Sequence, residues 1–331
     1  MKVEQKKIDA QNLELTINIA AEDYAQSQKK KFTERKRNAE FKGFRKGMVP
    51  ASLIQRVYGE QILVESVNEA VSRTLDEYIN AEQLHILGEP LASENQPEVE
   101  WKDGNDFSFV FDVALSPEVK LDVDKSDEVP SYNVTVAAKD KAPMIENMKK
   151  YYAEKPDEEK KTDEEIEAEV TERMKEQYRQ EAEWRLSKDI RDHFVNKAGL
   201  QLPEAFLKRW LFVANDGKFS KEDIEKEFAG FAEDFKWQMV RGFLMDKYGL
   251  KIEQNDITDA AEAYVRYQYA MYGMGNVPAE LLKEAANNVL SDRKQLDRII
   301  EQVEDQKVLA KLKEEITIKP TKISASKFRE L

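Results

Sequence analysis

The sequence contains no cysteine, and its 331 residues include two histidines. Without cysteine the chain can form neither a disulfide framework nor a thiol-based active site, and it is compatible with a reducing compartment. The two histidines, His85 and His193, lie far apart in the sequence and have no paired acidic residues at ligand spacing. Because a zinc site needs three or four ligands in a suitable pattern, we expect no metal site.

The sequence also lacks long apolar runs and nucleotide-binding motifs. No stretch is long and apolar enough to cross a bilayer, and the N-terminal residues MKVEQKKIDA lack the apolar core of a signal peptide. No P-loop pattern occurs, and Gly273-Met274-Gly275 lacks the third glycine and the preceding strand of a dinucleotide-binding fingerprint. We therefore expect a cytoplasmic protein with no membrane partner, no cofactor and no catalytic residues.

The composition favours a folded chain with much solvated surface. Charged residues make up 35% of the sequence and hydrophobic residues 41%. The first value is high for a compact globule, and the second is too high for a disordered chain. Long helices with a solvated face would reconcile the two, and the length is sufficient for two or three domains.

Positive charge is concentrated in residues 29–46, which contain nine Lys or Arg against two Glu, a local net charge of +7. Since the whole chain has a net charge of −13, the remaining residues carry −20. A basic segment on an acidic protein is expected where one face meets a polyanion, although such runs are often only a solvated helix face. The side chains that we expect to support a basic face are Lys30, Lys31, Arg35, Arg37 and Lys42.

Residues 40–50 predict a loop that follows a helix over residues 21–38. Gly43 and Gly47 free the backbone on either side of Phe44-Arg45-Lys46, and Pro50 prevents a helix from continuing through the segment. An aromatic side chain at such a tip has few neighbours of its own, so we expect it to contact a partner. The alternative is that Phe44 folds back onto its own domain.

The same loop resembles a known recognition signature. Residues 43–50, Gly-Phe-Arg-Lys-Gly-Met-Val-Pro, are similar at every specified position to the ribosome-docking signature of bacterial trigger factor, Gly-Phe-Arg-x-Gly-x-x-Pro. The resemblance implies that Arg45 and Lys46 meet rRNA phosphate or acidic ribosomal side chains while Phe44 enters an apolar crevice. The ribosome-binding residues that it implies are Gly43, Phe44, Arg45, Lys46, Gly47 and Pro50.

The trigger factor resemblance implies a function as well as a site. It implies an ATP-independent chaperone that docks on protein and rRNA of the large ribosomal subunit, near the exit tunnel, and holds nascent and unfolded polypeptides. A homodimer away from the ribosome stays open as a further partner. The family is also associated with protein folding, protein transport and cell division.

The first part of the chain predicts an α+β domain over residues 1–115. Four aliphatic residues between positions 13 and 19 alternate with polar ones, which is typical of a strand. After the loop we expect a short helix over residues 51–58 and a long one over 61–81. Residues 98–101 and 107–111 then predict a β-hairpin joined by the turn at 103–105. This order of elements is similar to that of the ribosome-binding domain of trigger factor.

Residues 116–161 predict a linker, extended to about residue 140 and followed by a short helix over 142–153 and a charged, Pro-containing break over 154–162. Trigger factors usually carry a prolyl isomerase domain of the FK506-binding type here, and the sequence leaves no room for it. We therefore expect no enzymatic activity. The sequence does not decide between a natural short form and a removed domain.

The remaining residues, 162–331, predict a mostly α-helical domain with protruding arms, in an elongated, multidomain chain. Its clearest helix covers residues 163–198 and ends at Gly199, and further helices are expected over 203–214, 220–248, 256–272 and 278–314. A strand-like segment over 316–323 and a short helix from Ser324 close the chain. The helices are long for the apolar area that they can bury on one another, which favours arms over a bundle.

A client-binding surface is expected near residues 263–274, where apolar residues occupy more than one helical face. One predicted stripe contains Tyr264, Tyr267 and Met271, and the other contains Val265, Tyr269 and Tyr272. Met and Tyr suit a surface that accepts many sequences, although both stripes could equally pack between helices. The candidate client-binding residues are Tyr264, Tyr267, Tyr269, Met271, Tyr272, Trp184 and Trp210.

Two other functions stay open from the sequence. The first is an RNA-binding protein that uses the basic segment 29–46. The second is a member of the same family that retains peptidyl-prolyl isomerase activity.

Overall fold

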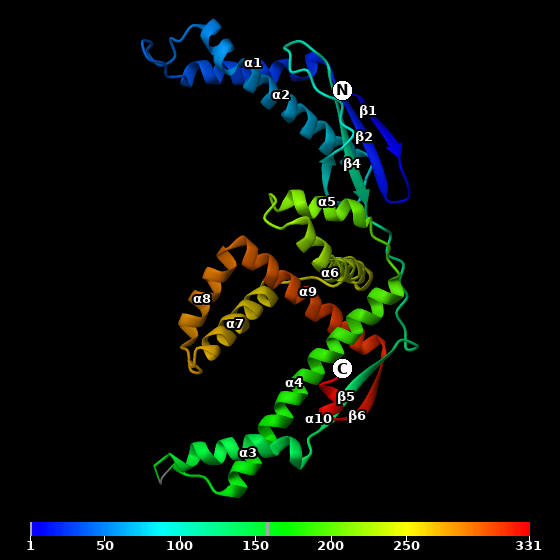
Figure 1. Ribbon diagram of the computed structural model, residues 1–331, viewed down its shortest axis with the longest axis vertical. Coiled ribbons are helices and arrows are strands. Elements are labelled where there is room, and N and C mark those ends of the chain that lie inside the picture. The colour runs from blue at the N-terminus through cyan, green and yellow to red at the C-terminus, as the bar shows by residue number, and fades with distance from the viewer. Residues whose placement is uncertain (1, 157–158) are drawn as a thin grey trace. The chain divides into compact units, whose positions relative to one another are not determined.

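The structure, a computed structural model, describes residues 2–156 and 159–331 (Figure 1). Its contacts divide the chain into two compact units. The α+β unit comprises Met1–Glu118 and Gln201–Ala232, and the helical unit comprises Val119–Leu200 and Glu233–Leu331. Residues 157 and 158, which belong to the predicted charged break, lie outside the described residues.

The α+β unit contains a four-stranded antiparallel sheet of order β1-β2-β4-β3. Its strands are β1 (Lys2–Lys7), β2 (Asn12–Ile19), β3 (Ile86–Ala92) and β4 (Phe107–Leu115). Two helices, α1 (Ala21–Asn38) and α2 (Ala51–Ala81), pack on one another and on the sheet. The alternation predicted for β2 is confirmed, because Leu13, Leu15, Ile17 and Ile19 are all buried in the core between sheet and helices.

The hairpin predicted around residues 103–105 is wrong. The antiparallel partner on the outer side of β4 is β3, and residues 98–101 are not a strand. The Val110 N–H donates to the Gln96 side chain at 2.6 Å, and the Val110 carbonyl accepts from the Ser93 N–H at 2.8 Å, so this part of β4 is partnered by a loop. Trp101 packs its ring on Phe107, with centroids 5.2 Å apart. An aromatic contact thus replaces the predicted strand pairing.

The break predicted between two helices near Gly59 is also absent, since α2 runs without interruption. Glycine within a helix costs roughly 0.5–1 kcal/mol relative to alanine. Nine other buried residues along α2, from Ile54 to Leu75, supply the packing that outweighs this cost.

A helical hairpin packs against the sheet within the α+β unit. It consists of α5 (Glu204–Ala214) and the first part of α6 (Lys221–Tyr248). The Trp210 ring lies so close to Gly88 of β3 that a β-carbon at position 88 would lie 2.7 Å from it. Arg209 pairs with Asp112 of β4 at 2.6 Å. These contacts explain why residues 201–232 group with the sheet and not with the predicted helical domain 162–331.

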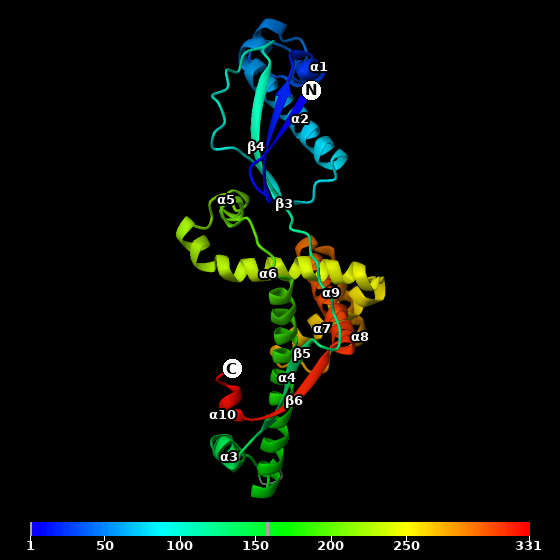
Figure 2. The same ribbon diagram turned by 90° about the vertical axis from the view of Figure 1, so that its right-hand side faces the viewer.

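The helical unit contains two parallel strands among helices. The strands are β5 (Glu128–Thr135) and β6 (Thr317–Ser324), and β5 packs along α4 (Asp163–Ala198) (Figure 2). The remaining helices are α3 (Ala138–Ala153), the rest of α6, α7 (Gln254–Met271), α8 (Ala279–Ser291), α9 (Arg293–Glu315) and α10 (Ala325–Phe328). Helices α4, α6 and α9 share a core that includes Phe194, Trp237 and Leu312.

Two predictions about helix ends have different outcomes. The prediction for α4 is confirmed at both ends, because Thr162 caps it through the Glu165 N–H and Gly199 ends it with a φ of +58°. The single helix predicted over residues 278–314 is wrong. Asp292 accepts a hydrogen bond from the Gln295 N–H at 3.0 Å and thereby begins α9 as a separate helix after α8.

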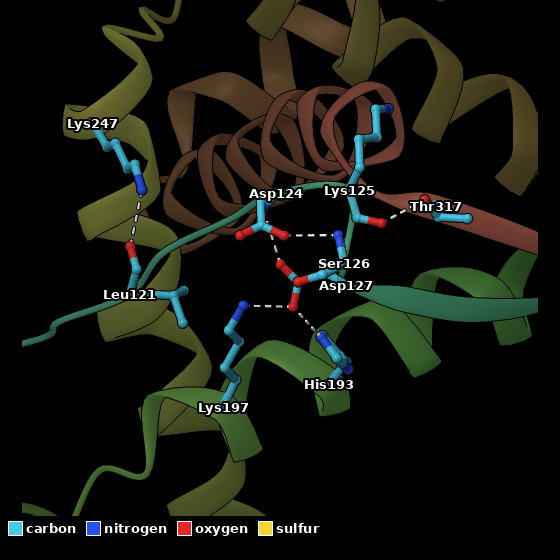
Figure 3. Close-up of polar contacts among 9 residues, drawn as sticks. All are labelled: Leu121, Asp124, Lys125, Ser126, Asp127, His193, Lys197, Lys247 and Thr317. Carbon is cyan, nitrogen blue, oxygen red and sulfur yellow. Dashed lines mark hydrogen bonds and ion pairs between the residues drawn. The ribbon is translucent and has the colours of Figure 1, made fainter.

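The extended connector predicted from residue 116 is fastened to the helical unit along much of its length (Figure 3). The Leu121 carbonyl accepts from the Lys247 Nζ at 2.9 Å, and the Lys125 carbonyl accepts from the Thr317 hydroxyl at 2.7 Å. Asp127, whose side chain is 4% exposed, lies 2.6 Å from Lys197 Nζ and 2.8 Å from His193 Nε2. Beyond Asp127 the chain continues as β5, so the predicted linker forms part of the fold of this unit.

Candidate docking loop and aromatic helix tip

The loop between α1 and α2 is held in shape by two turns. The Phe44 N–H donates to the Phe41 carbonyl at 3.0 Å, and the Met48 N–H donates to the Arg45 carbonyl at 2.9 Å. Gly43 and Gly47 have φ angles of +92° and +80°, which other residues adopt only with strain. The two glycines therefore allow a short, defined tip.

The base of the loop is anchored while its tip stays open. Val49 is buried in a small cluster with Ala39 and Ile54, and Phe41 packs edge-to-face on Tyr58 at 6.1 Å. Phe44 is 44% exposed and Met48 is 72% exposed. Phe44 is therefore not sealed inside its own domain, although slightly more than half of its side chain is covered.

Two of the five supporting cations pair with acids of α2. Lys31 pairs with Glu69 of α2 at 3.0 Å, and Arg35 pairs with Glu65 at 3.5 Å while lying over the Tyr58 ring. Hydrogen bonds from Ser27 and Lys31 lower the pKa of Glu69 below its usual value. Lys31 and Arg35 therefore help to hold α1 on α2, and the acids of α2 partly offset their positive charge.

Most of the other cations of the segment have no acidic partner in the described structure. Within the described residues no carboxylate lies within 4 Å of six of them, namely Lys29, Lys30, Lys36, Arg37, Lys42 and Arg45. Lys46, at the tip, makes a long 3.5 Å contact with the exposed Glu40. Lys29 and Lys36 were not among the predicted site residues. Helical spacing could have found Lys29, which shares one side of α1 with Thr33 and Arg37 and lines a 370 Å³ depression with them.

The end of the α7–α8 hairpin exposes a group of large apolar side chains. Its members, which we call the aromatic tip, are exposed by 50–82%: Tyr267, Met271, Tyr272, Met274 and Leu281. On the opposite side of α7, Val265 is buried against Leu282 and Ala286 of α8. The hairpin thus has a packed inner face and an apolar outer end.

The two predicted stripes do not divide as expected. Tyr264 and Tyr269 are partly buried against the α8 core, whereas Tyr267, Met271 and Tyr272 are exposed. The helix ends at Met271, and Tyr272 has a φ of −90° and a ψ of 13°. The prediction placed Tyr272 on the same helical face as Val265, but Tyr272 lies beyond the end of the helix and does not share that face.

The two candidate tryptophans differ in their surroundings. Trp184 on α4 is 67% exposed. Trp210 packs against Gly88, and its Nε1 is buried without a hydrogen-bond partner in the part of the chain that the structure describes. Trp210 thus serves to hold α5 on the sheet, which corrects its placement among exposed client-binding residues.

Neither metal-binding clusters nor membrane-spanning helices occur among residues 2–156 and 159–331. The sequence predicted a linker where an isomerase domain is usual. There, the described residues between β5 and α4 form helix α3 and a short connection, and they contain no strand.

Two protein-family models match the chain. The model described as "Bacterial trigger factor protein (TF)" matches residues 1–148, and the one described as "Probable trigger factor, C-terminal domain" matches residues 182–331. Residues 149–181 lie between the two matches.

Individual trigger factors are more distant. The trigger factor of Saccharophagus degradans is 32% identical over 140 residues, which are 42% of this chain and 31% of that protein. The trigger factor of Glaesserella parasuis serovar 5 is 28% identical over 153 residues, or 46% and 35% of the two chains. The matched part of the chain thus spans about a third of the length of these relatives.

A solved structure shares the fold. It is described as "Promiscuous Substrate Recognition in Folding and Assembly Activities of the Trigger Factor Chaperone", and it is similar with a TM-score of 0.56 and 14% identity. The similarity covers 95% of this chain and all of the other. An α+β N-terminal domain and a mostly helical remainder are therefore common to both. Since models of the N-terminal and C-terminal domains of one family together match every residue except 149–181, the chain belongs to the trigger factor family.

Proposed function

We propose that this protein is an ATP-independent chaperone that docks on the large ribosomal subunit through the 40–50 loop and holds unfolded polypeptides on its aromatic tip. The observation that carries the docking proposal is Phe44, which is 44% exposed at the end of an anchored loop between two glycines with positive φ. Family membership and the chaperone named in the similar structure support the general role.

The docking contact combines an apolar anchor with charge. Burying the open part of Phe44 contributes less than the roughly 1.5–3 kcal/mol of a fully buried large side chain. Arg45 and Lys46 beside it, together with the α1 cations that lack an acidic partner in the described structure, attract rRNA phosphate or acidic ribosomal side chains, so binding weakens as salt rises. The anchor fixes the position, and the charges supply much of the attraction.

Client binding is proposed for the aromatic tip because its chemistry tolerates many sequences. Methionine is flexible and polarisable, and tyrosine offers an apolar ring with a polar end. Exposed apolar patches of this kind mark interaction sites in soluble proteins. The sequence contains no P-loop pattern, which favours holding without ATP.

We also propose that this chain does not act as a prolyl isomerase, because its residues between β5 and α4 offer no β-sheet pocket among those described. A refolding assay limited by proline isomerisation tests this directly. Acceleration of that slow phase by the purified chain would contradict the proposal.

Cosedimentation tests the docking site. The variant Phe44→Ala/Arg45→Ala/Lys46→Ala should lose binding to large subunits by tenfold or more while its circular dichroism stays unchanged. A matched control, Lys218→Ala/Phe219→Ala/Lys226→Ala, removes the same charge and one aromatic ring, with Phe219 being 53% exposed, and should bind normally. Equal binding by both variants would overturn the site.

Naked rRNA provides the second arm of this experiment. The docking proposal expects weak, salt-sensitive binding to free RNA and much tighter binding to intact subunits. Equal affinity for the two would favour the alternative function, an RNA-binding protein that uses segment 29–46.

A further inference from the structure

We propose that a groove in the α+β unit binds an extended, uncharged apolar segment of an unfolded polypeptide. It is a second client site, separate from the aromatic tip, and it rests on the proposed chaperone function. The groove has a volume of about 840 Å³ and lies between the sheet and the α5–α6 hairpin, all within the α+β unit.

The floor of the groove is apolar and is made from both sides. Leu13 and Leu91 come from strands β2 and β3, and Phe206 and Ile224 come from helices α5 and α6. These four side chains are between 2% and 8% exposed, so they form a packed surface. Pockets that hold small ligands measure about 300–1,000 Å³, and this one lies near the upper end of that range.

Two apolar side chains that line the groove are about half exposed. Ile8, in the turn between β1 and β2, and Val213, at the end of α5, are each 54% exposed. A segment lying along the groove would cover the exposed parts of both side chains, while the floor, which is already nearly buried, contributes shape and packing contacts. The gain comes from removing apolar surface from water, and it needs no particular sequence.

The charges that line the groove cancel in number, since Glu94, Asp112 and Glu225 balance three cations. Asp112 pairs with Arg209 at 2.6 Å, and Glu225 pairs with Lys208 at 2.8 Å. Lys221 lies over the Phe212 ring at 5.7 Å. Since these pairs leave little net charge to offer, the groove complements an uncharged segment better than a polyanion or a basic peptide.

The neighbouring strand edge is blocked against main-chain pairing. Although β3 is an edge strand of the sheet, Pro90 lacks an N–H and the register shifts between Leu87 and Leu91. Trp210 also covers Gly88 on this edge. Recognition therefore falls to side chains entering the apolar floor, and not to addition of a further strand.

The test compares two valines of similar exposure in the same unit. Val213 lines the groove, whereas Val57 of α2, which is 49% exposed, does not. The variants Val213→Glu and Val57→Glu are made in a background, called tip-less below, in which Tyr267→Ser/Met271→Ser/Tyr272→Ser replaces the three most exposed side chains of the aromatic tip. The probe is an uncharged, dansyl-labelled ten-residue peptide rich in Leu and Phe, and its fluorescence anisotropy gives Kd.

The expected result is a rise in Kd of tenfold or more for Val213→Glu and no change for Val57→Glu. A photoreactive benzoylphenylalanine at position 213, but not at position 57, should cross-link to the peptide. Val213→Ser adds no charge and should weaken peptide binding by a smaller factor. It serves as a control in case the Glu variant does not fold.

Three outcomes would overturn the groove. If the tip-less parent binds no peptide while the complete protein does, the groove is wrong and the chaperone function stands. If Val213→Glu changes a dimer into a monomer in sedimentation without changing Kd, the groove holds a second copy of the chain. If the complete protein neither binds the peptide nor suppresses aggregation, the proposed function fails together with the groove.

Discussion

The carboxylate of Asp127 fastens the connector to the helical unit, and its removal should measurably destabilise that unit. One of its oxygens contacts Lys197 and His193, and the other accepts the Asp124 N–H at 3.0 Å (Figure 3). The substitution Asp127→Ala leaves a lysine, a histidine and a backbone N–H without this acceptor.

The expected loss of folding free energy depends on how exposed the two charged partners are to solvent. Removing one member of a fully buried ion pair costs roughly 3–5 kcal/mol, because the other charge stays buried alone. The side chains of Lys197 and His193 are 33% and 31% exposed, so solvent compensates part of this cost. We therefore expect Asp127→Ala to lower the free energy of unfolding by about 2–3 kcal/mol.

The pH dependence of stability should change in the same variant. Burial alone would raise the pKa of Asp127, but hydrogen bonds from Lys197, His193 and the Asp124 N–H outweigh burial and lower its pKa. A carboxyl with a pKa lower in the folded than in the unfolded state stabilises the fold above its unfolded pKa of about 4 and loses this contribution as the pH falls through the folded value. The difference between wild type and Asp127→Ala should therefore shrink below about pH 4.

Urea denaturation followed by tryptophan fluorescence provides the measurement. Glu128, the next residue, makes a surface ion pair with Lys319 and serves as the control. Because exposed pairs contribute little, Glu128→Ala should cost less than about 1 kcal/mol. Equal losses for the two variants, or a loss for Asp127→Ala that does not depend on pH, would refute the reasoning.

Two further predictions concern the proposed sites. Gly43→Ala places a β-carbon at a φ of +92° and should destabilise the loop by about 1 kcal/mol, lowering ribosome affinity in cosedimentation with no change in global unfolding; unchanged affinity would show that the tip conformation does not matter. Tyr267→Ser/Met271→Ser/Tyr272→Ser removes exposed apolar side chains and should weaken suppression of aggregation of a denatured client several-fold while leaving ribosome binding intact; full activity of this variant would place client binding elsewhere.

Sequence reasoning succeeded where local signals agree with packing. The bounds of α4 were predictable because Thr162 and Glu165 form a capping box and Gly199 ends the helix. The loop was predictable because Gly43 and Gly47 require special backbone angles. In each case the determining residues lie within a few positions of the feature that they produce.

Sequence reasoning failed where residues far apart in the sequence determine the structure. Strand β3 was missed because its interior contains Gly88 and Pro90, and its place depends on Trp210 from another part of the chain. The pairing of Lys31 and Arg35 depends on acids of α2 that lie about 30 residues away or more. A sequence shows which charges exist on a helix, but the packing partner decides which of them face solvent.

Helix α4 illustrates the same limit over a longer distance. Its main buried residues recur every four positions: Ile166, Val170, Met174, Tyr178, Ala182, Leu186, Ile190 and Phe194. Because a helix has 3.6 residues per turn, each step of four overshoots a full turn by about 40°. The buried stripe therefore winds around the helix, and positions 174 and 190 differ by roughly 160°.

The buried residues of α4 belong to two different hydrophobic cores. Residues up to Ala182 pack with α10, β5 and α3, and residues from Leu186 onward pack with α6 and α9. The first half includes most of residues 149–181, which neither family model matches, yet it buries Phe328 from the matched C-terminal part. The α4 residues of this unmatched segment are therefore built into the fold of the helical unit.

A single substitution that shortens one buried side chain can test whether the two cores unfold independently. Val170 is fully buried, and Val170→Ala should cost about 1–3 kcal/mol through lost packing. Hydrogen exchange in β6 and α10 should then accelerate about tenfold or more, while the segment of α6 around Val240 and Leu244 keeps its protection. If hydrogen exchange accelerates equally in both regions, the two halves of α4 unfold together. The hypothesis that the two cores unfold separately would then be wrong.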